Sequence, residues 1–127
     1  MKQAENFHDG FVDGVLVEND SARILVQTVR HEKFTILLSG VKSLVLNDFR
    51  QGNIILSLEW MDATKISDES IFDYYHYKPG DADSGALRSK FVHSVEGQQL
   101  RALEIEPSYG AALVAIFKES EIKSGYV

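Results

Sequence analysis

The chain contains no cysteine. It therefore has no disulfide framework and no thiolate that could act as a nucleophile or metal ligand. Its apolar residues never form a run close to the roughly 20 residues that a membrane-spanning helix requires, so we expect no membrane role. The stretch Met1–Asn6 is polar and lacks the apolar core of a secretion signal, so we expect a cytoplasmic protein.

Basic residues are also few. The sequence has 13 Lys and Arg residues against 19 Asp and Glu residues, which gives a formal net charge of -6 at pH 7. A negative surface repels phosphate backbones, so we expect no nucleic-acid partner. The same field would attract a basic protein, although an acidic surface also serves solubility alone.

The rest of the composition is that of a soluble globular protein, with 44% hydrophobic and 25% charged residues. At 127 residues the chain is long enough to bury one core without a metal or disulfides. No internal repeat or low-complexity segment divides it. We expect a single domain over residues 1–127.

Alternation of apolar and polar residues predicts strands along most of the chain, because successive strand side chains point to opposite faces. The clearest pattern follows a turn at residues 50–53, and its apolar face consists of Ile54, Leu56, Leu58 and Trp60. Similar patterns occupy residues 11–18, 22–30, 34–38, 90–96, 100–106 and 111–118. Residues 41–47 form either a short strand or a single helical turn, and the polar residues 119–127 are predicted to fray.

One helix is predicted, over Asp68–Tyr77. Ser67 is suited to cap its N-terminus, and the acidic residues that follow are favourable near the positive end of the helix dipole. Pro79 and Gly80 end it. Residues 78–85 consist almost wholly of turn residues, which indicates a loop.

Seven or eight short strands and one helix are typical of the mainly β class. We expect a single-domain antiparallel sandwich or a strongly curved sheet, with the short helix near residues 68–77 lying over an end or an open face. A closed barrel that binds a ligand would produce the same alternation, so it is a second possible architecture.

Few residues carry a chemical signal. His8 and Asp9 are adjacent, as in some metal-binding dyads, but further ligands at a suitable spacing are missing, which favours a turn role. Asp81 and Asp83 alternate as at the start of a calcium loop, yet the glycine comes one place early and no Glu follows at the twelfth position. His93 lies on an apolar strand face, where a hydrogen-bonded core histidine is the favoured interpretation. We predict no catalytic residue, metal ligand or cofactor.

The segment from Phe72 to Tyr77 has the most unusual local composition, with three tyrosines, a histidine and an acid. Tyrosine provides rigid contact area at a low entropy cost, which is typical of interaction hot spots. The candidate interaction residues are Asp73, Tyr74, His76 and Tyr77. The alternative is that Phe72 and Tyr75 pack the helix on the sheet while the other two tyrosines cover its flanks.

Three stretches in the first half carry a family resemblance: Phe7-His8-Asp9, Ser39-Gly40-Val41 followed by Leu44, and Asp48 to Ile55. They resemble small bacterial proteins of the immunity-protein 50 type and related families of unknown function. The resemblance implies a bacterial, cytoplasmic protein that neutralises a cognate toxin by binding it. It includes no catalytic motif and assigns no functional residue.

Three functions remain. The preferred one is a small non-enzymatic binding protein with a protein partner of basic character, and copurification of such a partner would favour it. The second is a small-molecule binder or hydrolase with a β-lined pocket, which an apolar cavity reached by His93, or by Asp and His together, would favour. The third is an oligomeric structural domain, such as a homo-oligomer, which a large self-complementary apolar patch would indicate.

Overall fold

A computed structural model describes residues 6–78 and 80–127. In this part of the chain, eight strands form one antiparallel sheet in the order β4-β7-β6-β5-β1-β2-β3-β8. The strands are β1 (Phe11–Glu18), β2 (Ser21–Gln27), β3 (Lys33–Ser39), β4 (Ser43–Asn47), β5 (Asn53–Asp62), β6 (Arg101–Tyr109), β7 (Ala112–Phe117) and β8 (Glu119–Ser124). The helices are α1 (Asp68–Tyr75) and α2 (Ser84–Val95), with a 3-10 turn η1 (Ala63–Lys65) before them.

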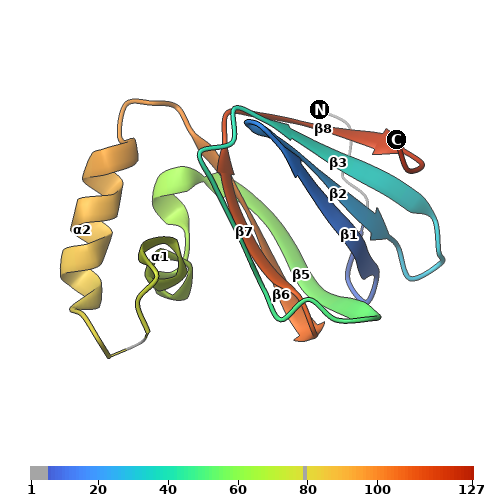
Figure 1. The fold of residues 1–127 in the computed structure, drawn as a ribbon, viewed down its shortest axis with the longest axis horizontal. Helices are drawn as coiled ribbons and strands as arrows, with labels where there is room; N and C mark the ends of the chain where they lie inside the picture. The colour runs from blue at the N-terminus through green and yellow to red at the C-terminus, as the bar shows by residue number, and fades with distance from the viewer. Residues whose placement is uncertain (1–5, 79) are drawn as a thin grey trace.

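The sheet bends sharply between β5 and β1. These strands pair at only two positions, Phe11 with Ile54 and Val12 with Asn53. The bend creates two halves that face each other, as Figure 1 shows: the helix-side half (β4, β7, β6 and β5) and the far half (β1, β2, β3 and β8). The predicted mainly β fold is confirmed. The described sheet is open, with β4 and β8 at its edges, so the closed-barrel alternative is wrong.

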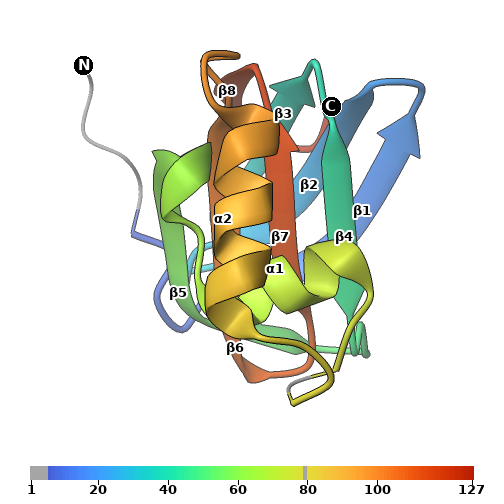
Figure 2. The ribbon, with the colours of Figure 1, turned by 90° about the vertical axis from the view of Figure 1, so that its left-hand side faces the viewer.

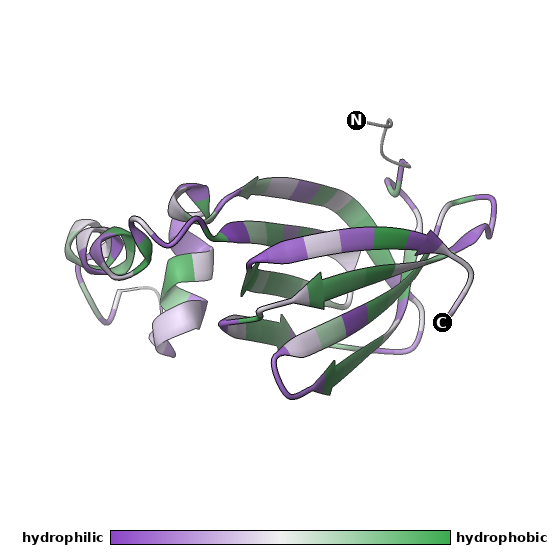
Figure 3. Cartoon of the chain, turned by 90° about the horizontal axis from the view of Figure 1, so that it is seen from above, coloured by the Kyte–Doolittle hydropathy of each residue, from purple (hydrophilic) through white to green (hydrophobic). Residues whose placement is uncertain are grey.

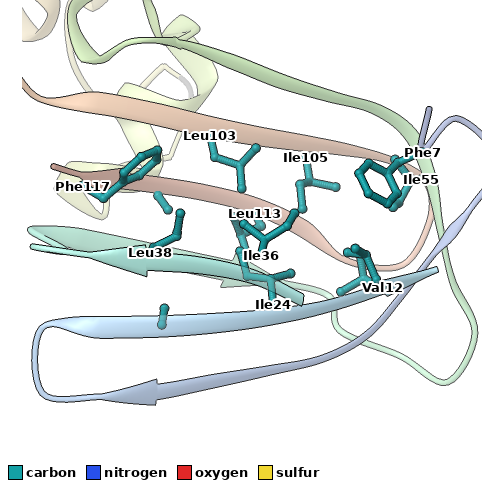
Figure 4. Close-up of a cluster of buried hydrophobic side chains, with 13 residues drawn as sticks. Phe7, Val12, Ile24, Ile36, Leu38, Ile55, Leu103, Ile105, Leu113 and Phe117 are labelled. Carbon is teal, nitrogen blue, oxygen red and sulfur yellow. The ribbon is translucent and has the colours of Figure 1, made fainter. Parts of the chain in front are cut away.

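Apolar side chains from both halves fill the space between them (Figure 4). Ile24 and Ile36 from the far half, and Ile55 and Leu103 from the helix-side half, have no solvent exposure. Seen from above, hydrophobic residues are frequent along the strands of both halves (Figure 3). Because removal of apolar surface from water is the main favourable term in folding, this inner core holds the two halves together.

Both helices lie on the outer face of the helix-side half (Figure 2). Ile71 of α1 and Phe91 of α2 are buried in an outer core that they share with Ile116 of β7. On its opposite face, β7 contributes Leu113 and Phe117 to the inner core. β7 is therefore covered on both sides, as expected from its nearly continuous apolar run.

β5 is irregular at its start. Its register against β6 shifts on both sides of Ile55, which is a β-bulge. Ile55 consequently lies in the inner core, whereas Leu56 is 42% exposed and Leu58 and Trp60 pack inward. The predicted apolar face is thus correct at Leu58 and Trp60 and wrong at Leu56, because a bulge exchanges the two faces of a strand.

Residues 84–95 form a helix, so the strand predicted over residues 90–96 is wrong and the described chain has two helices. The buried residues of α2 are Leu87, Phe91 and Val95. Their i, i+4 and i+8 spacing places them on one helical face, although the last two also belong to a short alternation that favours a strand. Asp83 stabilises the start of this helix, because its side chain accepts hydrogen bonds from two backbone N–H groups of the first turn.

Residues 119–124 form the edge strand β8, which pairs with β3, so the predicted frayed tail is wrong there. Ile122 is the one residue of β8 that packs against the inner core, and the others are exposed. Charged side chains are common on edge strands because they prevent further strands from adding. The polar composition of this segment is therefore that of an edge strand and not of a frayed tail.

Candidate functional site

The four predicted interaction residues lie at the C-terminal end of α1. Asp73 and Tyr74 are half-buried, whereas His76 is exposed and Tyr77 is 46% exposed. The Tyr74 ring packs edge-on against the Phe91 ring of α2, with 5.0 Å between the ring centroids. Tyr74 therefore joins the two helices, and the free contact area of the segment is at His76 and Tyr77.

His76 ends α1. Its φ of 63° lies in the left-handed region. The backbone N–H groups of His76 and Tyr77 donate to carbonyls of the last helical turn at 3.1 and 2.9 Å, as in a helix C-cap. The helix thus stops at Tyr75, before the predicted end at Tyr77, and Pro79 lies outside the described residues.

Glu104 of β6 holds the other end of α1. Its Oε2 accepts hydrogen bonds from the Ser67 N–H and Oγ, both at 2.9 Å, and from the Ser70 Oγ at 2.5 Å. Ser67 is the N-cap, as predicted, and its Oγ accepts from the Ser70 N–H at 3.1 Å. A carboxylate at this end is also favourable against the helix dipole. Glu104 therefore fixes the position of α1 over the sheet.

Replacing Glu104 with glutamine should lower the free energy of unfolding by about 2 kcal/mol, because bonds to a charged oxygen become bonds to a neutral one. Glu106→Gln, two residues further along β6, is the matched control and should change stability by less than about 0.5 kcal/mol. Urea unfolding followed by far-UV circular dichroism measures both variants. Equal losses would contradict the anchoring role of Glu104.

A small cleft opens beside this anchor, between α1 and the outer face of β6 and β7. Its volume is about 80 Å³, and it is partly open to solvent. Its lining carries four carboxylates and no Lys or Arg: Glu69 and Asp73 come from α1, and Glu104 and Glu106 from β6. Val45 of the edge strand β4 also lines it. We call the space bounded by these five residues the acidic cleft.

The carboxylates of the acidic cleft lack a cationic partner in the described part of the chain, where the salt bridges involve other residues. Burial raises the pKa of Asp73 above its ordinary value, because a charged carboxylate loses water there. Donors already surround one Glu104 oxygen. Among the described residues, Asp73, Glu69 and Glu106 lack such donors within the cleft. A bound cation would therefore stabilise the charged form of these three carboxylates.

The size of the cleft limits what it can hold. Pockets for drug-sized molecules have volumes of about 300–1,000 Å³. A volume of about 80 Å³ fits the end of one lysine or arginine side chain instead. The arrangement can therefore neutralise and orient a basic side chain.

Asp73 is one of the predicted interaction residues, whereas the sequence does not predict the half of the cleft that β6 provides. Glu104 and Glu106 alternate with Leu103 and Ile105, which indicates that the two acids share one face of a strand. Nothing local indicates that α1 lies over that face. The cleft depends on a contact between segments more than 30 residues apart, such as the bond from Ser67 to Glu104 with a separation of 37.

His8 and Asp9 lie in the exposed turn before β1. His8 Nε2 is 3.5 Å from Asp9 Oδ2, and His8 Nδ1 is 2.7 Å from the carbonyl oxygen of Leu56. Asp9 has a φ of 62° and donates its N–H to the Ile55 carbonyl. Both residues thus contact the start of β5, where the sheet bends.

His93 is exposed on α2, so its interpretation as a core histidine is wrong. The change from strand to helix explains the difference, because Phe91 and Val95 point inward one turn apart while His93 between them points away. His93 lines neither the acidic cleft nor the larger hollow described below. It therefore gives no support to a pocket-based function.

Asp83 is the N-cap of α2, and its Oδ1 accepts from the Gly85 and Ala86 N–H groups at 2.9 and 3.3 Å. Asp81 accepts from the Lys78 N–H at 3.3 Å. These carboxylates organise the loop and helix start that follow α1. In residues 6–78 and 80–127, no three His, Asp or Glu side chains are grouped so that they could hold a metal ion.

A larger hollow of about 530 Å³ lies on the outer face of β2, β3 and β8. Residues 125–127 cross this face beside it. The Thr35 Oγ donates to the Gly125 carbonyl at 2.7 Å and accepts from the Val127 N–H at 3.1 Å. Arg23 donates to the Val127 carbonyl at 3.1 Å. This segment covers Thr35, which has no solvent exposure.

Tyr126 belongs to the same segment, and its hydroxyl donates a hydrogen bond to Asp13 of β1. Burial, followed by the bond to Asp13, raises the pKa of Tyr126 to about 12. The folded-state pKa is thus above the unfolded value of about 10. The protonated Tyr126 hydroxyl therefore contributes its full stabilisation of the folded state below the unfolded pKa. That stabilisation is lost as the pH rises through the folded pKa.

Tyr126→Phe should accordingly be less stable than the wild type by about 1 kcal/mol at about pH 8, because one hydrogen bond is lost. The difference should shrink above about pH 10, where the wild type begins to lose the contribution of its tyrosine. Urea unfolding across this pH range measures it, with Tyr109→Phe as control because Tyr109 is 49% exposed. A difference that stays constant with pH would disprove this account of Tyr126.

Comparisons with protein-family models, curated proteins and solved structures found no match for this chain. The resemblance of its first half to immunity proteins therefore rests on the quoted residues alone. Neither of the helices in the described residues is long and apolar enough to cross a bilayer.

Proposed function

We propose that this protein is a non-enzymatic binding module that recognises a basic segment of a partner protein at the acidic cleft. The observation that carries the proposal is a set of four carboxylates around one small cleft without a Lys or Arg in its lining. Burial disfavours the charged form of Asp73, and a cation beside it would offset that cost. A lysine or arginine from a partner would supply that cation.

The charge of the whole chain supports the same partner. A formal net charge of -6 attracts a basic protein at long range and speeds its association. Salt screens charges beyond a distance of about 10 Å at about 0.1 M. Association should therefore slow as the salt concentration rises.

Side chains at the end of α1 would add contact area beside the cleft. Tyr77 is 46% exposed, and its neighbour His76 is exposed as well. Tyr75 is already engaged within the protein, since Lys90 Nζ lies 4.9 Å from the centre of its ring. Of the predicted interaction residues, Asp73 would thus contribute charge, and His76 and Tyr77 would contribute contact area.

The resemblance of the first half to immunity proteins suggests who the partner is. In this proposal the protein acts in a bacterial cytoplasm and neutralises a basic toxin by occupying part of its surface. The toxin would be encoded by a neighbouring gene. The protein itself performs no chemistry on it.

Asp73→Asn should weaken binding of the neighbouring gene product about tenfold, because one partly desolvated ion pair is lost. Isothermal titration calorimetry with that protein, in an inactive form, measures the dissociation constant. Asp20→Asn is the matched control: it makes the same change in charge at an exposed turn between β1 and β2 and should have an effect below about twofold.

Two results would count against the proposal. If the neighbouring gene product does not bind the wild type, toxin neutralisation is wrong. If both asparagine variants weaken binding equally, the partner responds to overall charge and not to the acidic cleft.

A further inference from the structure

We propose that the partner segment binds as an additional β-strand along the free edge of β4 and directs a lysine or arginine side chain into the acidic cleft. This inference rests on the proposed function and adds the mode of recognition. β4 has a free edge, the edge is suited to pairing, and a strand added there lies beside the cleft.

The edge of β4 is free. β4 pairs with β7 on one side and is the last strand of the described sheet on the other. Figure 2 shows it at the rim of the helix-side half, next to β7. Residues 43–46 are all half-buried, as expected for a strand that lacks a neighbour on one side. Its outward N–H and C=O groups are therefore available to a further strand.

The sequence of β4 is suited to pairing. Residues 43–47 are Ser-Leu-Val-Leu-Asn and carry no charge. The other edge strand, β8, has Glu119, Glu121 and Lys123, and charges of this kind discourage the addition of strands. Proteins that bind partners by strand addition use an exposed sheet edge. β8 thus carries charges that discourage the addition of a strand, whereas β4 carries none. This difference makes β4 the edge at which a partner strand would dock.

A strand added to β4 would reach the acidic cleft. Val45 lines the cleft and packs against the outer core, whereas Leu44 and Leu46 pack against the inner core. Strands lie about 4.8 Å apart, and a neighbouring strand has the same two faces. Residues level with Val45 on an added strand would therefore lie on the side of α1 and Asp73, and their neighbours in sequence would lie on the side of the inner core.

This geometry specifies the partner segment. It should be extended, with a Lys or Arg flanked on both sides by apolar residues. The basic side chain would extend over Val45 toward Asp73 of α1, because α1 contacts β4 whereas β6 lies beyond β7. The apolar neighbours would extend the row formed by Leu44 and Leu46. Main-chain hydrogen bonds would give affinity, and the basic side chain would give specificity.

A second copy of this chain is the competing occupant of the edge. Antiparallel pairing of two β4 strands would place both acidic clefts on the same face of the joined sheet, only a few strand spacings apart. Pairing centred on Val45 would also set Lys42 of each copy opposite Asp48 of the other, so charge does not exclude it. In that pairing, however, the residue level with Val45 is Val45 of the second copy, which brings no cation to the acidic cleft. A basic segment is the occupant that does, and sedimentation separates the two.

The test uses the full chain and a synthetic peptide, acetyl-Ser-Thr-Val-Lys-Val-Thr-Ser-amide, followed by ¹H–¹⁵N nuclear magnetic resonance. Addition of the peptide to about 2 mM should shift the amide signals of residues 43–47 and of the cleft residues of α1. The same peptide with Glu in place of Lys should bind about fivefold more weakly, as should a version with N-methyl groups on its pairing edge. Asp73→Asn should remove most of the preference for Lys over Glu.

The proposal is overturned if the Lys peptide causes no shifts at β4, if its Glu and N-methyl versions bind equally well, or if sedimentation shows a dimer that the peptide does not dissociate. A further measurement separates this proposal from the proposed function. If the neighbouring gene product still binds in the presence of saturating Lys peptide but loses affinity with Asp73→Asn, docking on β4 is wrong while recognition at the acidic cleft stands.

Discussion

Replacing Phe91 with alanine is expected to lower the free energy of unfolding by about 3–5 kcal/mol. Phe91 has no solvent exposure and lies in the outer core, with its ring 5.0 Å from that of Tyr74. The alanine leaves a cavity that the close-packed neighbours fill only in part. The expected loss is a large part of the about 5–15 kcal/mol that stabilises a typical domain.

Urea unfolding should be followed by far-UV circular dichroism and by the fluorescence of Trp60, the one tryptophan of the chain, which packs against Phe117 near the inner core. Phe49→Ala is the matched control, because Phe49 is 46% exposed, and it should cost less than about 1 kcal/mol. If the two probes give coincident transitions for Phe91→Ala, the helices and the sandwich unfold together. Equal losses for the two alanine variants would show that Phe91 is not a core residue.

The strands were the predictable part of this fold. In β2 and β3, Ile24, Val26 and Ile36 alternate with partly polar neighbours, so local pattern and final structure agree. Alternation also identified β7, because Leu113 and Ile116 point to opposite faces of a strand that is covered on both sides. These features depend on residues next to one another in the sequence.

The local pattern of apolar and polar residues did not predict α2, the bulge in β5, or the positions of β4 and Glu104. Residues 90–96 satisfy a short alternation and a helical spacing equally well, and the capping bond of Asp83 comes from a segment that reads as a loop. The bulge at Ile55 depends on how β5 fits against β6. The position of β4 beside β7, and that of Glu104 beneath α1, depend on pairing between distant segments, which periodicity does not encode.

Asn53 shows how much of this fold depends on one such long-range site. It begins β5 where the sheet bends toward β1, and it is 1% exposed. Its Oδ1 accepts from the N–H groups of Arg50 and Ala111 at 2.7 and 2.9 Å. Its Nδ2 donates to the carbonyls of Val12 and Arg50 at 3.1 and 2.6 Å. One side chain thus joins the turn before β5 to β1 and to the start of β7.

Asn53→Ala is therefore expected to lower the free energy of unfolding by about 3–5 kcal/mol, because each buried polar group left without a partner costs about 1–3 kcal/mol. Asn47→Ala is the matched control, since Asn47 is exposed in β4 and should cost less than about 1 kcal/mol. Urea unfolding of both variants measures the difference.

Asn53→Asp separates hydrogen bonding from packing at the same place, because the two side chains have nearly the same shape. The aspartate keeps an oxygen for the Arg50 and Ala111 N–H groups, but it turns a second oxygen toward the carbonyls of Val12 and Arg50. Two acceptors then face each other in a buried place, so the aspartate variant should be no more stable than the alanine variant. Wild-type stability for Asn53→Asp would mean that the Nδ2 bonds contribute nothing, and that the bend is held by its apolar neighbours alone.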